Sequence, residues 1–418
     1  MFCLLLISGN PFVGNVQFDL FLISFSLISI IRALRNYNKH VSYRTLIIII
    51  FFMGYELMHS VMFKLDYSLT IIKLFLVLML GLAIVGILKD RFLIVLRRTM
   101  VIISLISFVF VTLSYIPGIN KFLFQLAGNI FPVRMNWDGS STPTLLIYTF
   151  HPQYFEGSFS YVRNAGIFWE SGAFAVFLNL TLFFHYSTKR IRLFKDLFDK
   201  DSIILIIALI STTSTMGLIA FMILLTFFSS QLKTAVKYIV IVLAAASFYF
   251  AFYSVEFLGE KINKQLSKST TSNNRFGSAL MDLEDISERP LLGWSRRIEV
   301  VFGTSEFSAK THRPNGITNF LRNYGLVYCT VYFFLVFQSF NRIYLYHHKV
   351  GNLIFPAFGV FLLIVVSFSE PIFDLTFFKS LIFLYSVYLP IHQSEKLSKK
   401  SNYFLSPKPS SFIKSPAS

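Results

Sequence analysis

The sequence predicts an all-α polytopic integral membrane protein. Of its 418 residues, 55% are hydrophobic and only 14% are charged, and the mean hydropathy is +0.63. Soluble domains are less apolar and more highly charged. Apolar stretches of about 17 to 25 residues, the length needed to cross roughly 30 Å of hydrocarbon, recur along the chain. The bilayer is therefore the expected solvent for most of the molecule.

We predict about 11 membrane-spanning helices, within a range of 10 to 12. The predicted spans are about 12–31, 45–63, 67–88, 99–117, 165–186, 202–213, 215–230, 235–254, 323–340, 352–369 and 372–391. They define a single transmembrane domain, 1–391, followed by a basic tail, 392–418, that is expected to be disordered and cytoplasmic. With 11 spans the N-terminus lies outside, and a further partial span in residues 1–11 would move it inside.

The distribution of Lys and Arg sets the predicted orientation. Every second loop is basic, as at Lys189, Arg190 and Arg192, and basic loops stay on the cytoplasmic side. The two long loops, about 118–164 and 255–322, are then expected to face the periplasm. The net charge of +17 comes from Lys and Arg in short clusters between apolar runs, the arrangement that sets membrane topology. We therefore expect no nucleic acid partner.

Several ionisable residues are predicted to lie within or beside the spans, where charges are costly. Glu56 and Lys73 fall at similar depth in neighbouring spans, which predicts a buried ion pair. Glu370, Asp374 and Lys379 gather at the outer turn between the last two spans. They form either a network at the helix ends or part of a functional cavity.

The stretch 161–182, YVRNAGIFWESGAFAVFLNLTL, places an arginine and a glutamate at the mouth of an apolar segment. If the segment is helical from about residue 162, Arg163 and Glu170 lie on one face, roughly 10 Å apart along the axis. This spacing suits the two ends of one charged ligand. The alternative is a helix entrance with a snorkelling arginine and a glutamate paired to a neighbouring helix.

Two further segments carry signals of local structure. The segment STTSTMG, 211–217, separates two short predicted spans and is either a plain hairpin turn or irregular backbone that lines a wet cavity. In the second long loop, Leu280, Leu283 and Ile286 recur at helical intervals, and Pro290 follows. This pattern predicts a short amphipathic helix that ends before the proline.

The segment RNAGIFWESGAFAVFLNL resembles the motif that opens a central transmembrane helix in the O-antigen polymerase and ligase families. These families are membrane glycosyltransferases that assemble bacterial surface polysaccharides. The second long loop is similar to them in two places. Arg275 precedes a helix and the sequence PLLG at 290–293, and Asn315 and Gly325 match an Asn-containing stretch that leads into the next span.

The resemblance covers roughly residues 160–185 and 270–328. It implies a GT-C-like fold and transfer of a growing glycan from undecaprenyl pyrophosphate to a new lipid-linked repeat unit at the periplasmic face of the bacterial inner membrane. The implied partners are an undecaprenyl-pyrophosphate-linked oligosaccharide, membrane lipids and a chain-length regulator protein, with no cofactor and no metal. The only D-x-D, at 199–201, falls among lysines and is interpreted as solvated loop.

Arginines are the expected catalytic groups for such a reaction, because a guanidinium donates two parallel hydrogen bonds to phosphate oxygens and stabilises the charge of the leaving group. The resemblance points to Arg163 and Arg275 for this part, and Glu170 or His312 would act as the base. We prefer Glu170, because a carboxylate beside apolar walls can have a raised pKa. The residues expected to bind substrate are Trp169, Arg289, Asn315 and Asn319.

Two alternatives to a polymerase stay open. Ligases typically carry a histidine directly before the Asn of the second loop, where this chain has Pro314 and its nearest histidine is His312, so a polymerase is favoured. A flippase or other transporter of lipid-linked oligosaccharide would show an internal repeat and charges along a path through the membrane. No such repeat is found, and the polar residues of interest lie at the outer surface. An enzyme is therefore favoured over a transporter.

Overall fold

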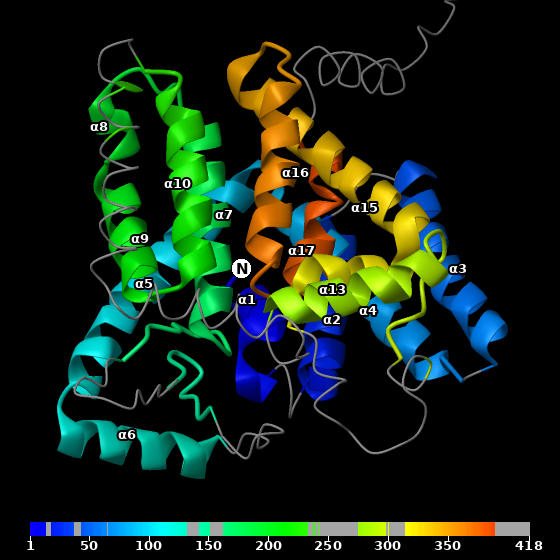
Figure 1. Cartoon of the computed structure of the whole chain (residues 1–418), viewed down its shortest axis with the longest axis horizontal. Helices are drawn as coiled ribbons and strands as arrows, with labels where there is room; N and C mark the ends of the chain where they lie inside the picture. The colour runs from blue at the N-terminus through cyan, green and yellow to red at the C-terminus, as the bar shows by residue number, and fades with distance from the viewer. Residues whose placement is uncertain are drawn as a thin grey trace, which may run out of the picture.

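The computed structural model describes residues 1–13, 18–36, 43–64, 66–131, 142–150, 162–232, 237–238, 242, 275–297, 300 and 314–388. The regular structure in these residues is helical, and they contain no β-strand, only an isolated bridge between Thr144 and Thr149 (Figure 1). The tail 392–418, His312 and most of the predicted span 235–254 lie outside the described residues.

The helices follow one another in an order close to that of the predicted spans. They are α1 (Phe2–Gly9), α2 (Phe18–Asn36), α3 (Tyr43–Phe63), α4 (Ser68–Leu88), η2 (Lys89–Arg91), α5 (Phe92–Ser114), α6 (Pro117–Ile130), α7 (Ser171–Ser187), α8 (Phe194–Leu197), α9 (Lys200–Ser211), α10 (Thr215–Ser229), α13 (Arg275–Glu288), α15 (Gly316–His348), α16 (Ile354–Ser367), α17 (Thr376–Leu381) and η3 (Leu384–Ser386).

Three helical stretches in the described part of the chain are long and apolar enough to cross a membrane: Tyr43–Phe63, Ser68–Ser114 and Gly316–His348. The second comprises α4 and α5, which meet at the short turn η2. α10 and α16 are apolar but shorter. The prediction of an all-helical protein with helices fit to cross a membrane is confirmed for the described residues, and the number of 11 spans stays a prediction.

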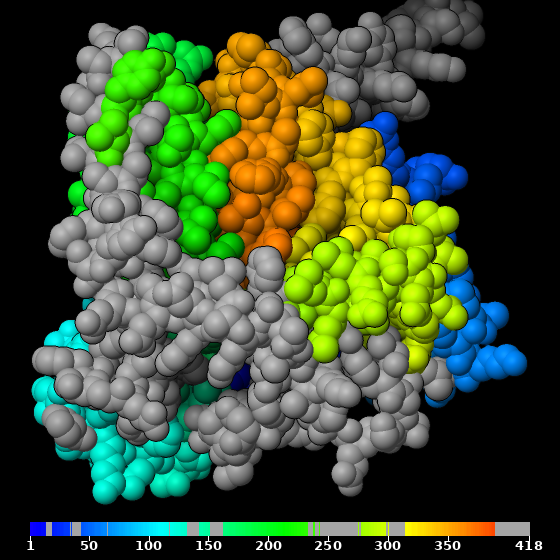
Figure 2. All heavy atoms as spheres, in the orientation of Figure 1, coloured from blue at the N-terminus to red at the C-terminus, as the bar shows by residue number. Residues whose placement is uncertain are grey.

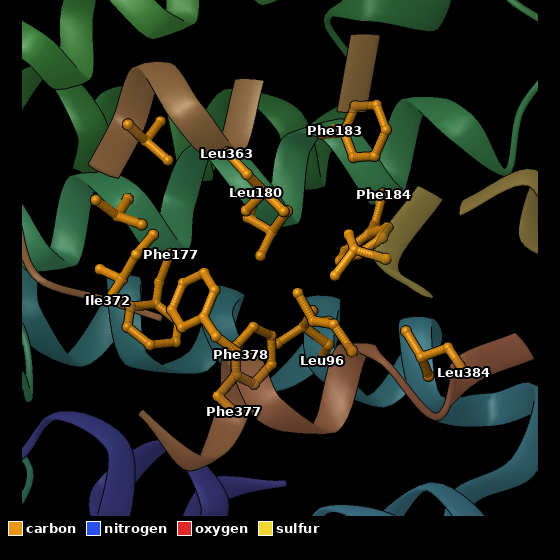
Figure 3. Packing of buried hydrophobic residues seen from close by; sticks show 14 of the residues in the cluster. Leu96, Phe177, Leu180, Phe183, Phe184, Leu363, Ile372, Phe377, Phe378 and Leu384 are labelled. Carbon is orange, nitrogen blue, oxygen red and sulfur yellow. The ribbon is translucent and has the colours of Figure 1, made fainter. Parts of the chain in front are cut away.

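α7 lies at the centre of the helical bundle, and every one of its residues is buried. It packs against α5, α9, α10 and α16. Phenylalanines dominate the surrounding core: Phe177 packs on Phe377 and Phe378 of α17, with ring centroids 5.1 and 5.4 Å apart (Figure 3). A helix that is apolar on all sides is stabilised inside other helices, so α7 is a fixed frame for the residues at its N-terminus.

The expected helix start near residue 162 is wrong, because α7 begins only after Glu170, its N-cap residue. A turn at Gly166 precedes it. The φ of Gly166 is +54°, which favours glycine, and its N–H donates to the Asn164 side chain at 3.0 Å. Arg163 and Glu170 therefore do not share a helix face.

Two other segments differ from the predicted pattern. The described part of the predicted span 372–391 contains only the short helix α17 and the turn η3. α17 is buried against α4 and α1, so this apolar segment is internal core. The first long loop, predicted as 118–164, contains helix α6. The difference at 372–391 arises because hydropathy alone does not separate a short buried element from a span.

α13 confirms the predicted short helix before Pro290. It packs on α15, and the two lie across each other in Figure 1. Leu280 and Leu283 of α13 are exposed, whereas Ser278 and Asp282 are fully buried. The face of α13 turned toward the protein therefore carries polar side chains, and Asp282 contacts Thr318 and Arg322 of α15.

Candidate functional site

Four side chains, Trp169, Glu170, Arg275 and Glu370, form a cluster that we name the Arg275 cluster. Arg275 Nη2 lies 3.1 Å from Glu370 Oε1 and 3.4 Å from Glu170 Oε1, although Arg275 and Glu170 are 105 residues apart in sequence. The Trp169 indole N–H donates to Glu370 Oε2 at 3.2 Å. Glu370 is almost fully buried, while Glu170 and Arg275 are half-buried. The cluster is thus accessible from the surface on the Glu170 and Arg275 side.

The members of the Arg275 cluster sit at the ends of different elements. Glu170 is the N-cap residue of α7, Arg275 is the first residue of α13, and Glu370 lies in the turn after α16. Two glycines allow this close approach. A Cβ at Gly172 would collide with the Glu370 carboxylate, and a Cβ at Gly316 would collide with the Glu370 carbonyl oxygen. Close packing around Glu370 therefore requires both glycines.

Two carboxyl groups share one guanidinium in the Arg275 cluster. Glu370 lies in a turn outside the membrane-crossing helices, where burial raises the pKa of its carboxyl well above the usual range. The adjacent Glu170 raises that pKa further, and Arg275 opposes both effects. Burial and the neighbouring carboxylate therefore favour the protonated form of Glu370. Both carboxyl groups contact Arg275 Nη2, and a guanidinium carries five N–H donors in all.

A buried set of contacts fixes α13 on α15. Arg322 Nη1 lies 3.3 Å from Asp282 Oδ1, and the Thr318 hydroxyl donates to Asp282 Oδ2 at 2.6 Å. Asn315 is the N-cap residue of α15 and accepts from the Thr318 N–H at 3.2 Å. Its side-chain amide donates to the Arg275 carbonyl oxygen at 3.4 Å. Asn315, predicted to bind substrate, thus contacts the backbone of Arg275 and links the starts of α13 and α15.

A backbone junction holds the other end of α13, and we name it the Gly293–Gly325 junction. It joins residues 290–295 to a kink in α15 through four backbone hydrogen bonds of 2.8 to 3.2 Å. The kink is at Gly325, with φ +69° and ψ 177°, a conformation essentially restricted to glycine. A Cβ at Gly293 would lie 2.6 Å from the Asn323 carbonyl oxygen. The two segments of the second long loop that resemble these families, 290–293 and 315–325, therefore pack against each other at this junction.

Arg289 and Asn319 each contact a side chain of their own segment. The Arg289 guanidinium lies over the Trp294 ring, 4.4 Å from its centroid. Asn319 accepts from the Asn323 side-chain amide at 2.7 Å, one turn into α15. Contact of either residue with a substrate stays a prediction.

Arg163 lies at the bend between α9 and α10 and is only 2% exposed. Its Nε donates to the Thr212 carbonyl oxygen at 3.1 Å and to the Thr213 hydroxyl at 3.0 Å. The adjacent Asn164 donates to the Ser211 hydroxyl at 2.9 Å. The last carbonyl groups of a helix have no partner within the helix, so Arg163 satisfies the C-terminus of α9. The contacts favour a hairpin turn for the segment 211–217, and phosphate binding by Arg163 stays a prediction.

We expect Arg163→Ala to lower the melting temperature of the detergent-solubilised protein, because hydrogen bonds from a charged donor contribute about 1.5–3 kcal/mol each. Scanning fluorimetry measures the shift, with the exposed Arg91→Ala as the matched control. A wild-type melting temperature together with lost activity would instead assign Arg163 to the reaction.

The expected ion pair between Glu56 and Lys73 is wrong. Lys73 pairs with Asp19 of α2 at 2.8 Å, and Glu56 Oε1 lies 3.6 Å from Arg296 Nε. Arg296 comes from the segment after the Gly293–Gly325 junction. Similar depth in the membrane predicted Lys73 as the partner of Glu56. The partner is instead Arg296, because the loop that contains it docks beside α3.

The predicted group Glu370, Asp374 and Lys379 separates into two parts. Glu370 belongs to the Arg275 cluster. Asp374 lies 3.3 Å from Lys379 Nζ and accepts from the Tyr324 hydroxyl at 3.0 Å. Glu370 is therefore a site residue that the predicted catalytic and binding set does not contain. Its sequence signal was an acidic residue at the outer turn between two apolar segments.

The D-x-D residues at the opposite end of α7 are ion-paired, which corrects their interpretation as solvated loop. Asp199 accepts from the Ser202 N–H at 3.0 Å, capping α9, and pairs with Lys189. Asp201 lies 3.2 Å from Arg97 of α5. Among the residues that the structure describes, no group of three or more His, Cys, Asp or Glu could hold a metal ion.

These contacts define a helical protein, with helices fit to cross a membrane, that holds two carboxyl groups against one partly exposed arginine. No protein-family model, no curated protein and no solved structure matches the chain. The cluster and the motifs that meet there are therefore the basis for assigning a function.

Proposed function

We propose that this chain is an O-antigen or related surface-polysaccharide polymerase. It would transfer a growing glycan from undecaprenyl pyrophosphate to a new lipid-linked repeat unit at the periplasmic face of the bacterial inner membrane. The observation that carries the proposal is the 3.4 Å contact between Arg275 and Glu170. Each comes from a separate segment that resembles these families, and unrelated chance matches would have no reason to meet in one cluster.

The cluster has the groups that the reaction needs. A bond forms between the acceptor hydroxyl oxygen and the anomeric carbon of the glycan, while the bond from that carbon to the pyrophosphate oxygen breaks. Arg275 stabilises the negative charge that develops on the leaving pyrophosphate. Glu170, the more exposed of the two carboxylates, accepts the hydroxyl proton. A protonated Glu370 spares the incoming anion a second negative charge.

The proposal includes a topology of about 11 spans with the Arg275 cluster on the periplasmic side. It is supported by the placement of charge along α7. The cluster lies at the N-terminal end of α7, and the basic loop that contains Lys189 and Arg192 follows its C-terminal end. Basic loops remain in the cytoplasm, so the opposite end of α7 would face outward.

Deletion of the gene tests the proposal against its alternatives. A polymerase joins repeat units on the lipid carrier, so its loss still allows one unit to be made, exported and attached. We expect lipopolysaccharide from the deletion strain to show a core-plus-one-repeat band on a gel, with long chains restored by complementation.

Two other outcomes of the deletion would contradict a polymerase. Bare core together with accumulated lipid-linked polymer would identify a ligase, which transfers finished glycan to the lipid A core. Single repeat units accumulating on the cytoplasmic face would identify a transporter. Replacing Pro314 by His is not expected to create ligase activity, because acceptor choice depends on a whole cavity.

A further inference from the structure

Helix α13 exposes leucine side chains although the face that it buries is polar. Leu280 and Leu283 are 48% and 51% exposed, whereas Ser278 and Asp282 are fully buried. Figure 2 shows α13 at the surface of the molecule, beside α15 and α16. Apolar side chains that gather on a surface mark a contact with a partner or with a membrane. We name Leu280 and Leu283 the leucine strip.

An acidic strip runs along α13 beside the leucine strip. At about 100° per residue, Leu280 and Leu283 lie about 60° apart around the helix axis. The exposed Glu284 and Glu288 follow on the far side of Leu280. Ser287 falls between the two leucines, but its hydroxyl donates to the Glu284 carbonyl oxygen at 2.7 Å and is satisfied within the helix. One apolar side and one charged side are typical of a helix that lies in a membrane interface.

Both ends of α13 lie beside the ends of apolar helices. At its start, Arg275 contacts Glu370 in the turn after α16. Just past its end, the Arg289 guanidinium lies 5.2 Å from the ring centroid of Phe63, the last residue of α3. The ends of α3 and α16 face the same side in the predicted topology. Figure 1 shows α13 lying across the direction of α16, so α13 runs along one boundary of the predicted membrane region.

The exposed apolar surface continues from the end of α13 onto α15. Leu291, in the segment after α13, is 60% exposed. Its carbonyl oxygen accepts from the Val327 N–H at 3.2 Å, and the neighbouring Leu326 and Val327 of α15 are exposed as well. α15 is long and apolar enough to cross a membrane, so its exposed apolar side chains are expected to face lipid. The apolar surface at the end of α13 therefore adjoins a surface that lipid would cover.

The bilayer fits the leucine strip better than a protein partner does. A specific protein interface takes about 800 Å² from each partner. Two half-exposed leucines bordered by carboxylates supply only a small part of such an area. Hydrocarbon needs no match of shape, and at a membrane boundary it covers the apolar side chains that reach it. The acidic strip would keep its contact with water on the other side of the helix.

We propose that α13 lies flat in the membrane interface on the predicted periplasmic side, with the leucine strip among acyl chains and the acidic strip toward water. This inference goes beyond the proposed function and does not depend on it, because it requires only a membrane around the apolar helices. Its consequence is a depth for Arg275, the first residue of α13. The guanidinium would lie at the level of the lipid headgroups, where the phosphate of a lipid-linked ligand is also found.

The test measures the surroundings of each strip with spin labels on single cysteines. The full-length protein is placed in nanodiscs of phosphatidylethanolamine and phosphatidylglycerol. Cys3 is exposed and is replaced by Ser throughout, whereas Cys329 is buried and is kept. Electron paramagnetic resonance then compares collisions of each label with oxygen, which concentrates in hydrocarbon, and with a neutral nickel chelate, which stays in water. The melting temperature of each variant confirms that it is folded.

Four exposed positions of α13 carry the labels, two on each strip. We expect Leu280→Cys and Leu283→Cys to shift toward oxygen, as does the lipid reference Phe334→Cys, whose native side chain is 56% exposed on α15. Glu284→Cys and Glu288→Cys are the matched controls and should shift toward the nickel chelate. Because the two sets alternate along one helix, only the orientation of α13 in the interface separates them.

Two results would overturn the interfacial position of α13. Equal access of the nickel chelate to labels on both strips would place the whole helix in water. Labels on the leucine strip that collide with neither reagent would show a protein contact, and since the nanodisc holds only this chain, that contact would be with a second copy. The two leucine positions report separately, so a variant that fails to fold leaves the other to decide.

Discussion

Arg275→Ala is expected to abolish polymer formation while the protein remains in the membrane at a near wild-type level. Arg275 makes the contacts on which the Arg275 cluster depends, 3.1 Å to Glu370 and 3.4 Å to Glu170. Removing a group that stabilises developing charge typically costs on the order of 10²–10³ in rate. Arg275→Lys should recover little, because an ammonium cannot reproduce the planar fork of the guanidinium. The readout is chain-length distribution on gels of lipopolysaccharide from a complemented deletion strain.

The matched control for Arg275 is Arg192→Ala, an exposed arginine in a predicted cytoplasmic loop. It should leave the long chains intact. Normal polymer in the Arg275→Ala strain would remove Arg275 from the mechanism, and loss of protein in that strain would assign it a structural part through its carboxylate contacts.

The second large effect is expected for Gly325→Ala. Gly325 adopts φ +69° and ψ 177°, and a Cβ there would collide with the Leu291 carbonyl oxygen. Strain in this region costs about 1–3 kcal/mol before the collision is counted. Because the Gly293–Gly325 junction docks α13, the substitution should both lower the melting temperature and displace Arg275. We expect a clear drop in thermal stability by scanning fluorimetry and loss of long chains in vivo.

Gly54→Ala is the matched control for Gly325. Gly54 lies within α3, and a Cβ there would meet nothing within 4 Å. Alanine should therefore be neutral or stabilising by up to about 1 kcal/mol. A Gly325→Ala protein as stable and active as the wild type would show that the kink does not need glycine.

Local patterns accounted for much of the helical structure. The run of leucine and isoleucine spaced before Pro290 predicted α13, because helix periodicity and a terminating proline are properties of a few neighbouring residues. Local patterns gave the wrong structure for two apolar segments, one interrupted by a turn and one buried in the core. The turn at Gly166 delays α7, and the burial of α17 against α4 makes an apolar segment internal.

The candidate site was predicted in part. The motifs selected Trp169, Glu170 and Arg275, which lie in one cluster, and Arg163, which lies at the bend between α9 and α10. The position of Glu370 at an outer turn is visible in the sequence, but its partners are not. Each of these side chains is charged or polar in an apolar context, which makes it visible in the sequence, but its partner comes from another part of the chain.

The sequence by itself determined the class of this protein, since hydropathy, helix periodicity and the spacing of basic loops are summed along the chain and need no knowledge of contacts. Only the tertiary structure decided which charges meet. Arg275 faces Glu170 and Glu370, Glu56 faces Arg296 and not Lys73, and the glycines of two separate loop patterns form one junction. The physical reason is that an ion pair forms through space, and the rotation and docking of helices far apart in sequence set which side chains come within reach.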